Sequence, residues 1–123
     1  MQLIGTDIIE IDRIKRVLGR WGTRFLHRVY TDSELSQCRM RLPSLAVRFA
    51  GKEAALKMLG TQTGGISWKD VEILSDSTGK PLVNLHGKAR LQADYLRLKN
   101  LAISLSHSRE YALAVVIGEA KEG

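Results

Sequence analysis

Asp7 is the first position whose surroundings suggest chemistry. It lies between Ile4 and Ile8-Ile9, in the most apolar stretch of the N-terminal half. An ionised carboxylate is costly in such a place unless a cation, a metal ion or several hydrogen-bond donors compensate it. A solvent-facing strand residue, or the N-cap of a helix beginning at Ile8, explains Asp7 equally well.

Glu53 is the second such position, on a helix expected over residues 45–59. Apolar residues lie on most sides of that helix, so it should be largely buried and its charges need a reason to be there. Phe49, Glu53 and Lys57 recur every four residues and share one face. An ordinary exposed Glu–Lys pair, worth only ~0.2–0.5 kcal/mol, has the same spacing. Gly51 costs ~1 kcal/mol relative to alanine and suggests a close approach by a neighbour or ligand.

A third candidate is the end of a predicted strand, where two hydroxyls and an imidazole occur together. Ser104, Ser106 and His107 suit a phosphate or another polar ligand, and they equally suit an ordinary β-turn with a solvated histidine. The sequence contains no Gly-x-Ser-x-Gly elbow and no metal-type histidine spacing. A hydrolase triad or a zinc site is therefore not supported.

Basic residues dominate residues 13–28. Six Lys or Arg side chains and no acidic one occur there, in a chain of formal net charge +6. If the helix is continuous, five arginines lie within roughly 120° of one face. They are Arg13, Arg16, Arg20, Arg24 and Arg28. Such a face favours nucleic acid, a phosphate-rich ligand or an acidic protein, although most charge runs are simply solvated.

The elements that must position these residues are strands and helices in mixed order. The expected strands cover residues 3–11, 67–74, 82–86, 101–106 and 111–117. The expected helical segments cover residues 12–29, 45–59 and 87–99, with a short helix after residue 31. The apolar residues that the third of these helices offers for packing are Ala89, Leu91, Ala93, Tyr95, Leu96 and Leu98. This order predicts an α+β fold with a mostly antiparallel sheet and packed helices.

Turn and capping residues set the boundaries. Gly19 and Gly22 suggest a break in the first helical segment. Thr31-Asp32-Ser33 offers an N-cap for the short helix, which Pro43 must end. Ser44 can cap the next helix, and Gly60 closes it. Two polar segments, residues 76–81 and 107–110, are expected to be hairpin turns, and residues 62–65 a loop.

The composition indicates one globular domain covering residues 1–123. The chain is 44% hydrophobic and 26% charged, as in ordinary globular proteins. Cys38 is the single cysteine, which excludes an intramolecular disulfide. We expect no signal peptide, because the first residues lack a basic segment, and no membrane span, because no apolar stretch approaches ~20 residues. A cytoplasmic location is expected.

Together these segments resemble the 4′-phosphopantetheinyl transferase family, in particular its short type. The segments that carry the resemblance are residues 5–13 (GTDIIEIDR), 48–57 (RFAGKEAALK), 79–81 (GKP) and 104–107 (SLSH). Each is weak alone, but they occur in the family's order and spacing over nearly the whole chain. Gly51 departs from the pattern, because this type often has alanine there.

The resemblance implies an activity and a set of roles. The enzyme would transfer the 4′-phosphopantetheine group of coenzyme A to a serine of apo acyl carrier protein, releasing adenosine 3′,5′-bisphosphate and supporting fatty acid biosynthesis. Asp7 and Glu53 would bind Mg²⁺, and Asp7, Glu53 and Lys57 would form the catalytic set. The residues implied to contact coenzyme A are Arg48, Lys57, Lys80, Pro81 and His107.

The resemblance also implies the partners. The short type assembles as a homotrimer with active sites between subunits. The arginines of residues 13–28 would dock the acidic carrier protein, with Arg13 and Arg24 the best matches to the family.

Two other classes of protein compete with this interpretation. The net charge of +6 would suit a small nucleic-acid-binding protein. The chain shows no helix-turn-helix, zinc or aromatic RNA-binding motif, and only 6% of its residues are aromatic, so we expect no nucleic-acid partner. A non-catalytic trimeric scaffold is the other alternative, and the presence of Asp7, Glu53 and Lys57 argues against it.

Overall fold

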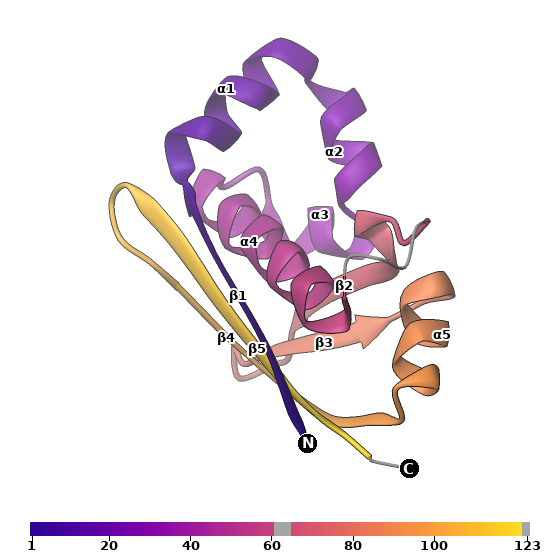
Figure 1. Ribbon diagram of the computed structural model, residues 1–123. Helices are drawn as coiled ribbons and strands as arrows, with labels where there is room; N and C mark the ends of the chain where they lie inside the picture. The colour runs from indigo at the N-terminus through magenta and orange to yellow at the C-terminus, as the bar shows by residue number, and fades with distance from the viewer. Residues whose placement is uncertain (61–64, 122–123) are drawn as a thin grey trace.

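A three-stranded antiparallel sheet with helices packed on one face forms the framework of the chain (Figure 1). The computed structural model describes residues 1–60 and 65–121. The strands of this sheet are β1 (Gln2–Glu10), β4 (Leu98–His107) and β5 (Tyr111–Ala120), in the order β1-β5-β4. A second sheet pairs β2 (Val71–Ser75) with β3 (Pro81–Leu85). Every strand pairing among the described residues is antiparallel, which confirms the predicted α+β class.

The helices cover one face of the larger sheet and extend beyond one end of it. Their bounds are α1 (Ile11–Trp21), α2 (Thr23–Val29), α3 (Asp32–Cys38), α4 (Leu42–Leu59) and α5 (Gly87–Tyr95), with a 3-10 helix η1 (Trp68–Asp70). Within residues 1–60 and 65–121, none of them has the length and apolar character needed to cross a lipid bilayer.

The contact between β1 and α4 is made by backbone rather than by side chains. A Cβ atom on Gly5 would lie 1.9 Å from the carbonyl oxygen of Ala54 and 2.9 Å from the amide nitrogen of Met58. Glycine is therefore required for this close approach. Gly51 has a similar reason, because a Cβ there would lie 2.4 Å from Cδ1 of Ile73. The close neighbour expected at Gly51 is thus a core side chain.

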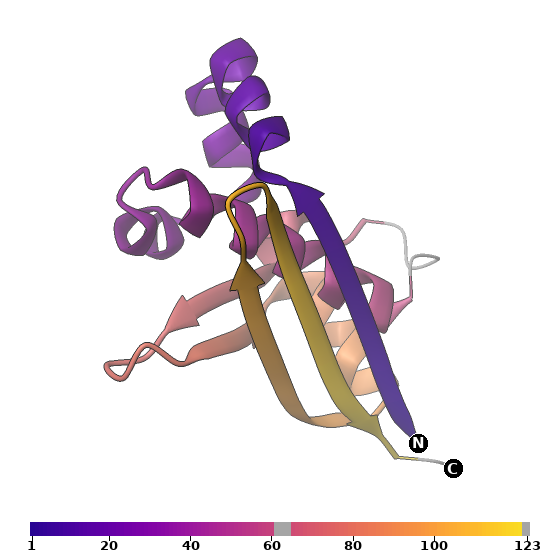
Figure 2. The same cartoon turned by 90° about the vertical axis from the view of Figure 1, so that its left-hand side faces the viewer.

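Side chains alternate between the two faces of β1, which explains how Asp7 can lie between Ile4 and Ile8 in the sequence and yet point to the face opposite theirs. Gly5 and Ile9 are buried on the face of β1 that packs on α4, whereas Ile4 and Ile8 point to the opposite face. Figure 2 shows that no described helix covers this opposite face. Ile4 and Ile8 are 65% and 63% exposed, and they pair across the sheet with Ile117 and Leu113, which are also exposed.

Several predicted boundaries are confirmed. The first helical segment is interrupted at Gly22, whose φ of 56° lies in the left-handed region, so α1 and α2 are separate helices. Thr31 caps α3 in a capping box with Glu34. Gly60 closes α4, and both expected hairpins form.

The predicted roles of Pro43 and Ser44 were wrong. α3 ends earlier, at Cys38, because Arg39 and Met40 both adopt positive φ. Pro43 lies in the first turn of α4, where its missing N–H has no helical acceptor to lose. Ser44 is inside that helix, and Arg41 occupies the N-cap position without a side-chain cap.

The predicted strand over residues 67–74 and the helix over 87–99 were each too long. Ser67 and Asp70 form a capping box that folds residues 68–70 into η1, so β2 begins at Val71. α5 ends at Tyr95, and residues from Leu98 onward belong to β4.

Only some of the residues expected to pack from this segment do so. Ala89 and Ala93 are buried and Leu96 and Leu98 pack at the edge of the core, whereas Leu91 and Tyr95 are exposed. The loop expected over residues 62–65 lies largely outside the described residues.

Candidate active site

Asp7 and Lys57 meet between β1 and α4. Asp7 is in the middle of β1, on the face that packs against α4, and its side chain is 17% exposed. Lys57 Nζ lies 3.0 Å from Asp7 Oδ1 and donates to the carbonyl of Thr6 at 3.2 Å. Asp7 is therefore neither a solvent-facing strand residue nor a helix N-cap.

Glu53 lies one turn before Lys57 on α4 and has a different partner. The indole Nε1 of Trp68 donates to Glu53 Oε1 at 2.8 Å. Among the described residues, Glu53 and Lys57 form no ion pair with each other, because Lys57 pairs with Asp7 instead. Asp7 and Lys57 thus meet between β1 and α4, and the carboxylate of Glu53, one helical turn before Lys57, is held by Trp68.

These carboxylates suit a hard divalent cation. In the part of the chain that the structure describes, no hydrogen bond is made by Oδ2 of Asp7 or by Oε2 of Glu53, and no cluster of three or more metal-ligating side chains occurs. Two carboxylates are too few for a closed zinc site. Mg²⁺ is typically held by one or two carboxylates together with substrate phosphate oxygens and water, so the donor set fits this ion.

Two neighbouring grooves lie on this side of α4, and Glu53 lines one of them. One has a volume of about 420 Å³ and is lined by Arg28, Glu53, Leu56, Gly65, Ile66, Ser67 and Trp68. The other has a volume of about 330 Å³ and is lined by Val17, Trp21, Arg24, Phe25, Arg28, Val29, Phe49 and Trp68. Arg28 and Trp68 line both, so the surface of α1 and α2 is continuous with the surroundings of Glu53.

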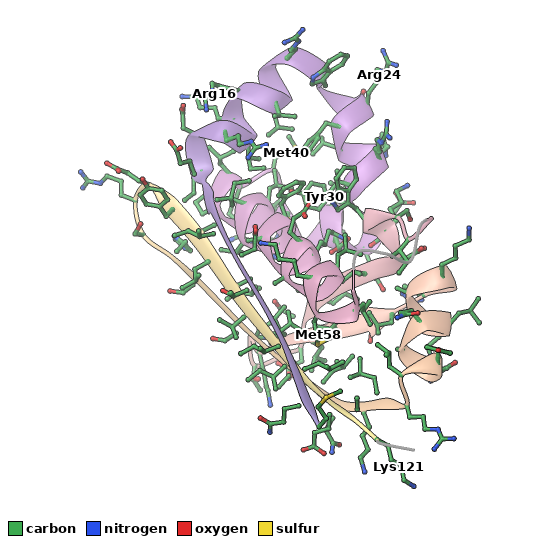
Figure 3. The ribbon with its side chains drawn as sticks, viewed as in Figure 1. Arg16, Arg24, Tyr30, Met40, Met58 and Lys121 are labelled. Atoms are coloured by element: carbon green, nitrogen blue, oxygen red, sulfur yellow. The ribbon has the colours of Figure 1, made fainter. Side chains whose placement is uncertain are left out.

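The five arginines predicted to dock a carrier protein are all exposed, but they do not form one helical stripe. Arg13, Arg16 and Arg20 lie on α1, and Arg24 and Arg28 lie on α2, beyond the break at Gly22. Figure 3 shows Arg16 and Arg24 projecting away from the body of the protein.

Two of these arginines pack beside an aromatic ring, and one pairs with an acid. The guanidinium carbons of Arg20 and Arg24 lie 5.3 and 6.0 Å from the ring centroid of Trp21. Arg16 pairs with Asp12 at 3.7 Å, and both side chains are exposed. The surface is therefore basic and partly aromatic.

Arg48 lies on another side of α4, against α3 and β2. Its side chain is buried and donates to the carbonyl of Ile73 at 3.1 Å, to Gln37 Oε1 at 3.2 Å and to Ser75 Oγ at 3.4 Å. Since Ser75 is paired with Pro81, the β2–β3 turn that carries Lys80 and Pro81 lies beside Arg48. A polar groove of about 570 Å³ opens here, lined by Ser36, Gln37, Arg39, Arg41, Ser44, Arg48, Ser75 and Asp76.

The residues predicted to contact coenzyme A are thus divided within one chain. Lys57 faces β1, whereas Arg48 faces α3 and β2. His107 is exposed at the end of β4, with Nδ1 3.2 Å from the carbonyl oxygen of Ser108. No contact among the described residues joins Lys57 to Arg48, Lys80 or His107.

A buried polar network next to Glu53 was not predicted from the sequence. Lys52 and Glu34 are both fully buried and form an ion pair at 2.7 Å. Burial lowers the pKa of Lys52, and the neighbouring Glu34 carboxylate opposes this shift. Close by, Tyr30 donates to the carbonyl of Leu45 at 2.6 Å, and burial raises the pKa of its hydroxyl. A lysine on a helix that is apolar all round was the available signal for this network.

Comparison with known proteins places this chain in one class. Residues 3–116 match the 4′-phosphopantetheinyl transferase superfamily, and the chain belongs to it.

Within the superfamily, the chain is similar to holo-[acyl-carrier-protein] synthases. The synthase of Dehalococcoides mccartyi (strain CBDB1) is 51% identical over 119 residues, covering 97% of this chain and 99% of the relative. The Helicobacter pylori synthase in complex with coenzyme A has a TM-score of 0.86 at 34% identity, covering 95% of this chain and 100% of that one. The Neisseria meningitidis synthase has a TM-score of 0.86 at 32% identity, with 95% and 97% covered.

Proposed function

We propose that this protein is a Mg²⁺-dependent phosphopantetheinyl transferase that converts apo acyl carrier protein to its holo form. The donor is coenzyme A, and the by-product is adenosine 3′,5′-bisphosphate. The observation that carries the proposal is the Lys57–Asp7 contact between α4 and β1, with Glu53 one helical turn before Lys57, in a chain similar to named holo-[acyl-carrier-protein] synthases. Residues 1–123 are proposed to act as one catalytic domain in fatty acid biosynthesis.

The reaction is a displacement at phosphorus. The serine Oγ of the carrier attacks the phosphorus that bears the pantetheine arm, and a new Oγ–P bond forms. The bond from that phosphorus to the oxygen of adenosine 3′,5′-bisphosphate breaks. Glu53, the carboxylate nearer the grooves, takes the serine proton, and Lys57 offsets negative charge on the leaving group.

The carboxylates of Asp7 and Glu53 would hold the metal ion. A Mg²⁺ ion bound by these residues would supply electrostatic stabilisation of the charge that develops on the pyrophosphate oxygens. Lys57 keeps the Asp7 carboxylate in place at 3.0 Å while leaving its second oxygen without a hydrogen bond to any described residue.

The carrier protein is proposed to dock on α1 and α2. Acyl carrier proteins are acidic, and the five exposed arginines of these helices present the complementary charge. The groove lined by Arg24, Arg28 and Trp68 continues towards Glu53, so a carrier bound there would bring its serine to the carboxylate.

A homotrimer with sites shared between subunits is proposed as the active form. The uncovered face of the sheet presents Ile4, Ile8, Leu113 and Ile117, an apolar surface that a second copy can cover. Lys57 and Arg48 face different sides of α4, so a ligand held by both kinds of residue would have to contact two chains. A cytoplasmic location and the absence of a nucleic-acid partner stay predictions from the sequence.

The intact mass of the carrier tests the proposed activity. Purified protein is incubated with apo acyl carrier protein, coenzyme A and Mg²⁺, and the carrier is expected to gain one phosphopantetheine group. EDTA and the Asp7→Ala substitution should each abolish the gain. An unchanged carrier mass with several apo carriers would contradict the proposal, and salt-resistant binding to duplex DNA would then favour a nucleic-acid protein.

A further inference from the structure

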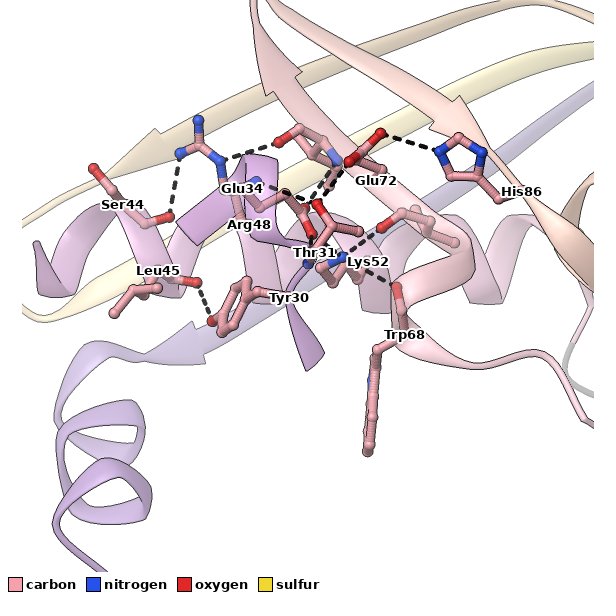
Figure 4. Close-up of polar contacts among 12 residues, drawn as sticks. Tyr30, Thr31, Glu34, Ser44, Leu45, Arg48, Lys52, Trp68, Glu72 and His86 are labelled. Atoms are coloured by element: carbon pink, nitrogen blue, oxygen red, sulfur yellow. Dashed lines mark hydrogen bonds and ion pairs between the residues drawn. The ribbon is translucent and has the colours of Figure 1, made fainter. Parts of the chain in front are cut away.

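A buried ion pair lies beside Glu53 and is connected to it through Trp68. The side chains of Lys52 and Glu34 are both 0% exposed, and Nζ lies 2.7 Å from Oε1 (Figure 4). Desolvation of two charges is costly, and apolar residues of similar volume often stabilise a fold as well or better. A positional role would therefore explain this pair better than a contribution to stability.

The pair fixes the backbone of η1 and the start of β2. Lys52 Nζ also donates to the carbonyls of Trp68, at 3.0 Å, and Val71. Glu34 accepts hydrogen bonds from the backbone amides of Thr31 and Ile73, each at 2.9 Å. Among the described residues, no buried side-chain nitrogen or oxygen atom lacks a hydrogen-bond partner. These hydrogen bonds therefore fix the positions of α3, α4, η1 and β2 relative to one another.

Two consecutive residues of α4 hold Trp68 at both ends. Lys52 binds its carbonyl oxygen, and Glu53 accepts a hydrogen bond from its indole Nε1 at 2.8 Å. The indole ring also packs against Phe49, with centroids 6.0 Å apart. The indole ring is therefore held in one orientation by Lys52, which binds the backbone of Trp68, by the ring of Phe49 and by the carboxylate of Glu53.

We propose that Trp68 is a positioning residue for Glu53, and that the buried Lys52–Glu34 pair fixes Trp68 for this purpose. The inference rests on the proposed function, because it concerns the same carboxylate. Rotation of a glutamate carboxylate about its last side-chain bond is only weakly restricted, so one hydrogen bond selects an orientation. An indole nitrogen donates and cannot accept, and it therefore holds Oε1 while leaving Oε2 for a cation or the serine proton.

Trp68→Phe tests the role of the indole, because it keeps an aromatic ring against Phe49 and removes the N–H group. Mn²⁺, a hard cation detected by electron paramagnetic resonance, is titrated in the presence of coenzyme A. We expect the variant to bind Mn²⁺ about 10–100-fold more weakly and to lose kcat by a similar factor, as when other orienting partners are removed. The KM values for coenzyme A and carrier should change little, and a purely structural role would not produce this split.

Trp21→Phe is the matched control for the Mn²⁺ titration. Trp21 lines the same groove as Trp68, but among the described residues its indole makes no hydrogen bond to a carboxylate. This variant should bind Mn²⁺ as the wild type does. Wild-type Mn²⁺ affinity and kcat in Trp68→Phe would overturn the inference.

A second measurement separates this inference from the proposed function. In ¹H–¹⁵N spectra, the indole resonance of Trp68 should shift in Glu53→Gln, while that of Trp21 should not. If the resonance shifts but the wild type transfers no phosphopantetheine, the hydrogen bond stands and the proposed function fails. If the wild type is active and the Trp68 resonance is unmoved, the positioning role fails alone.

The anchor is tested by replacing both partners with apolar residues. The double variant Lys52→Met/Glu34→Leu removes the buried charges together, which avoids leaving one of them unpaired. A reduced kcat with unchanged KM values, matching Trp68→Phe, supports the anchoring role. Wild-type kcat in the double variant would overturn it.

Discussion

Lys57 Nζ lies 3.0 Å from Asp7 Oδ1, and this contact joins α4 to β1 across 50 positions of the chain. The lysine side chain is half-exposed and the aspartate side chain largely covered. A contact of this kind contributes little to stability, typically ~0–1 kcal/mol. Its effect should therefore appear in catalysis rather than in folding.

Lys57→Met is expected to lower kcat by roughly 100-fold, because the proposed mechanism needs the charge of Lys57 to offset that of the leaving group. The thermal midpoint should change little. Lys99→Met removes the same charge from an exposed position on β4 and should behave as the wild type. Initial rates from carrier mass, together with melting curves, measure both effects. A wild-type kcat in Lys57→Met would remove this residue from the catalytic set.

Gly5→Ala should destabilise the protein and reduce its activity. The new Cβ would lie 1.9 Å from the carbonyl oxygen of Ala54, so β1 and α4 must separate. We expect a loss of at least ~1–3 kcal/mol in the free energy of unfolding, the usual cost of overpacking. Gly19→Ala is the control, because a Cβ there meets nothing within 4 Å. Urea titration compares the two variants, and equal stability would contradict the backbone contact.

Arg24→Glu is expected to raise the KM for the carrier by roughly tenfold or more, because it places like charge opposite an acidic partner. The KM for coenzyme A should be unchanged. Arg90→Glu makes the same change in net charge on α5, a separate helix that lies below α2 in the view of Figure 1, and should leave the carrier KM as it is. If both variants raise the carrier KM equally, net charge rather than docking on α2 is responsible.

Ile8→Asp should disrupt self-association. Ile8 is 63% exposed on the uncovered face of the sheet, and a charge buried there between subunits would be costly. Light scattering after size exclusion should give a trimer for the wild type and a monomer for the variant. Leu91→Asp, at a 68% exposed position on α5, should remain trimeric. A monomeric wild type would contradict the proposed assembly.

Glu72 should contribute stability that is lost in acid. Partial burial raises the pKa of this carboxyl, but hydrogen bonds from Thr31, His86 and Asn84 and the charge of His86 together lower it by more, so in the folded protein it lies below its usual value of 4.5. Such a group stabilises the fold above its unfolded-state pKa, and the contribution disappears as pH falls through the lowered folded-state pKa.

The Glu72→Gln variant tests this contribution. At neutral pH it should be less stable than the wild type by about 1 kcal/mol. Thermal denaturation at a series of pH values should show this difference shrinking on the acid side. A difference of the same size at every pH would contradict the assigned pKa.

The sequence was informative where structure is decided locally. Gly22, Thr31 and Gly60 act through backbone conformation or a cap three residues away, and each was predicted in its observed place. Pro43 was placed at the wrong helix, because proline is tolerated at a helix start as readily as it ends one.

The interactions that the sequence could not show join distant elements. The Lys52–Glu34 pair and the Trp68–Glu53 hydrogen bond connect residues 18 and 15 positions apart, and no periodicity reports them. The family resemblance named Asp7, Glu53 and Lys57, but it gave no partner for the carboxylate of Glu53.

The glycine contact between β1 and α4 brings two backbones together without intervening side chains. At Gly5 the backbone of β1 touches the backbone of α4. The distance between the strand that carries Asp7 and the helix that carries Glu53 therefore does not depend on side-chain rotamers or volumes at this contact. This backbone contact limits how closely β1 and α4 can approach each other. Repacking elsewhere in the core can then change stability while the separation of β1 and α4 at Gly5 stays the same.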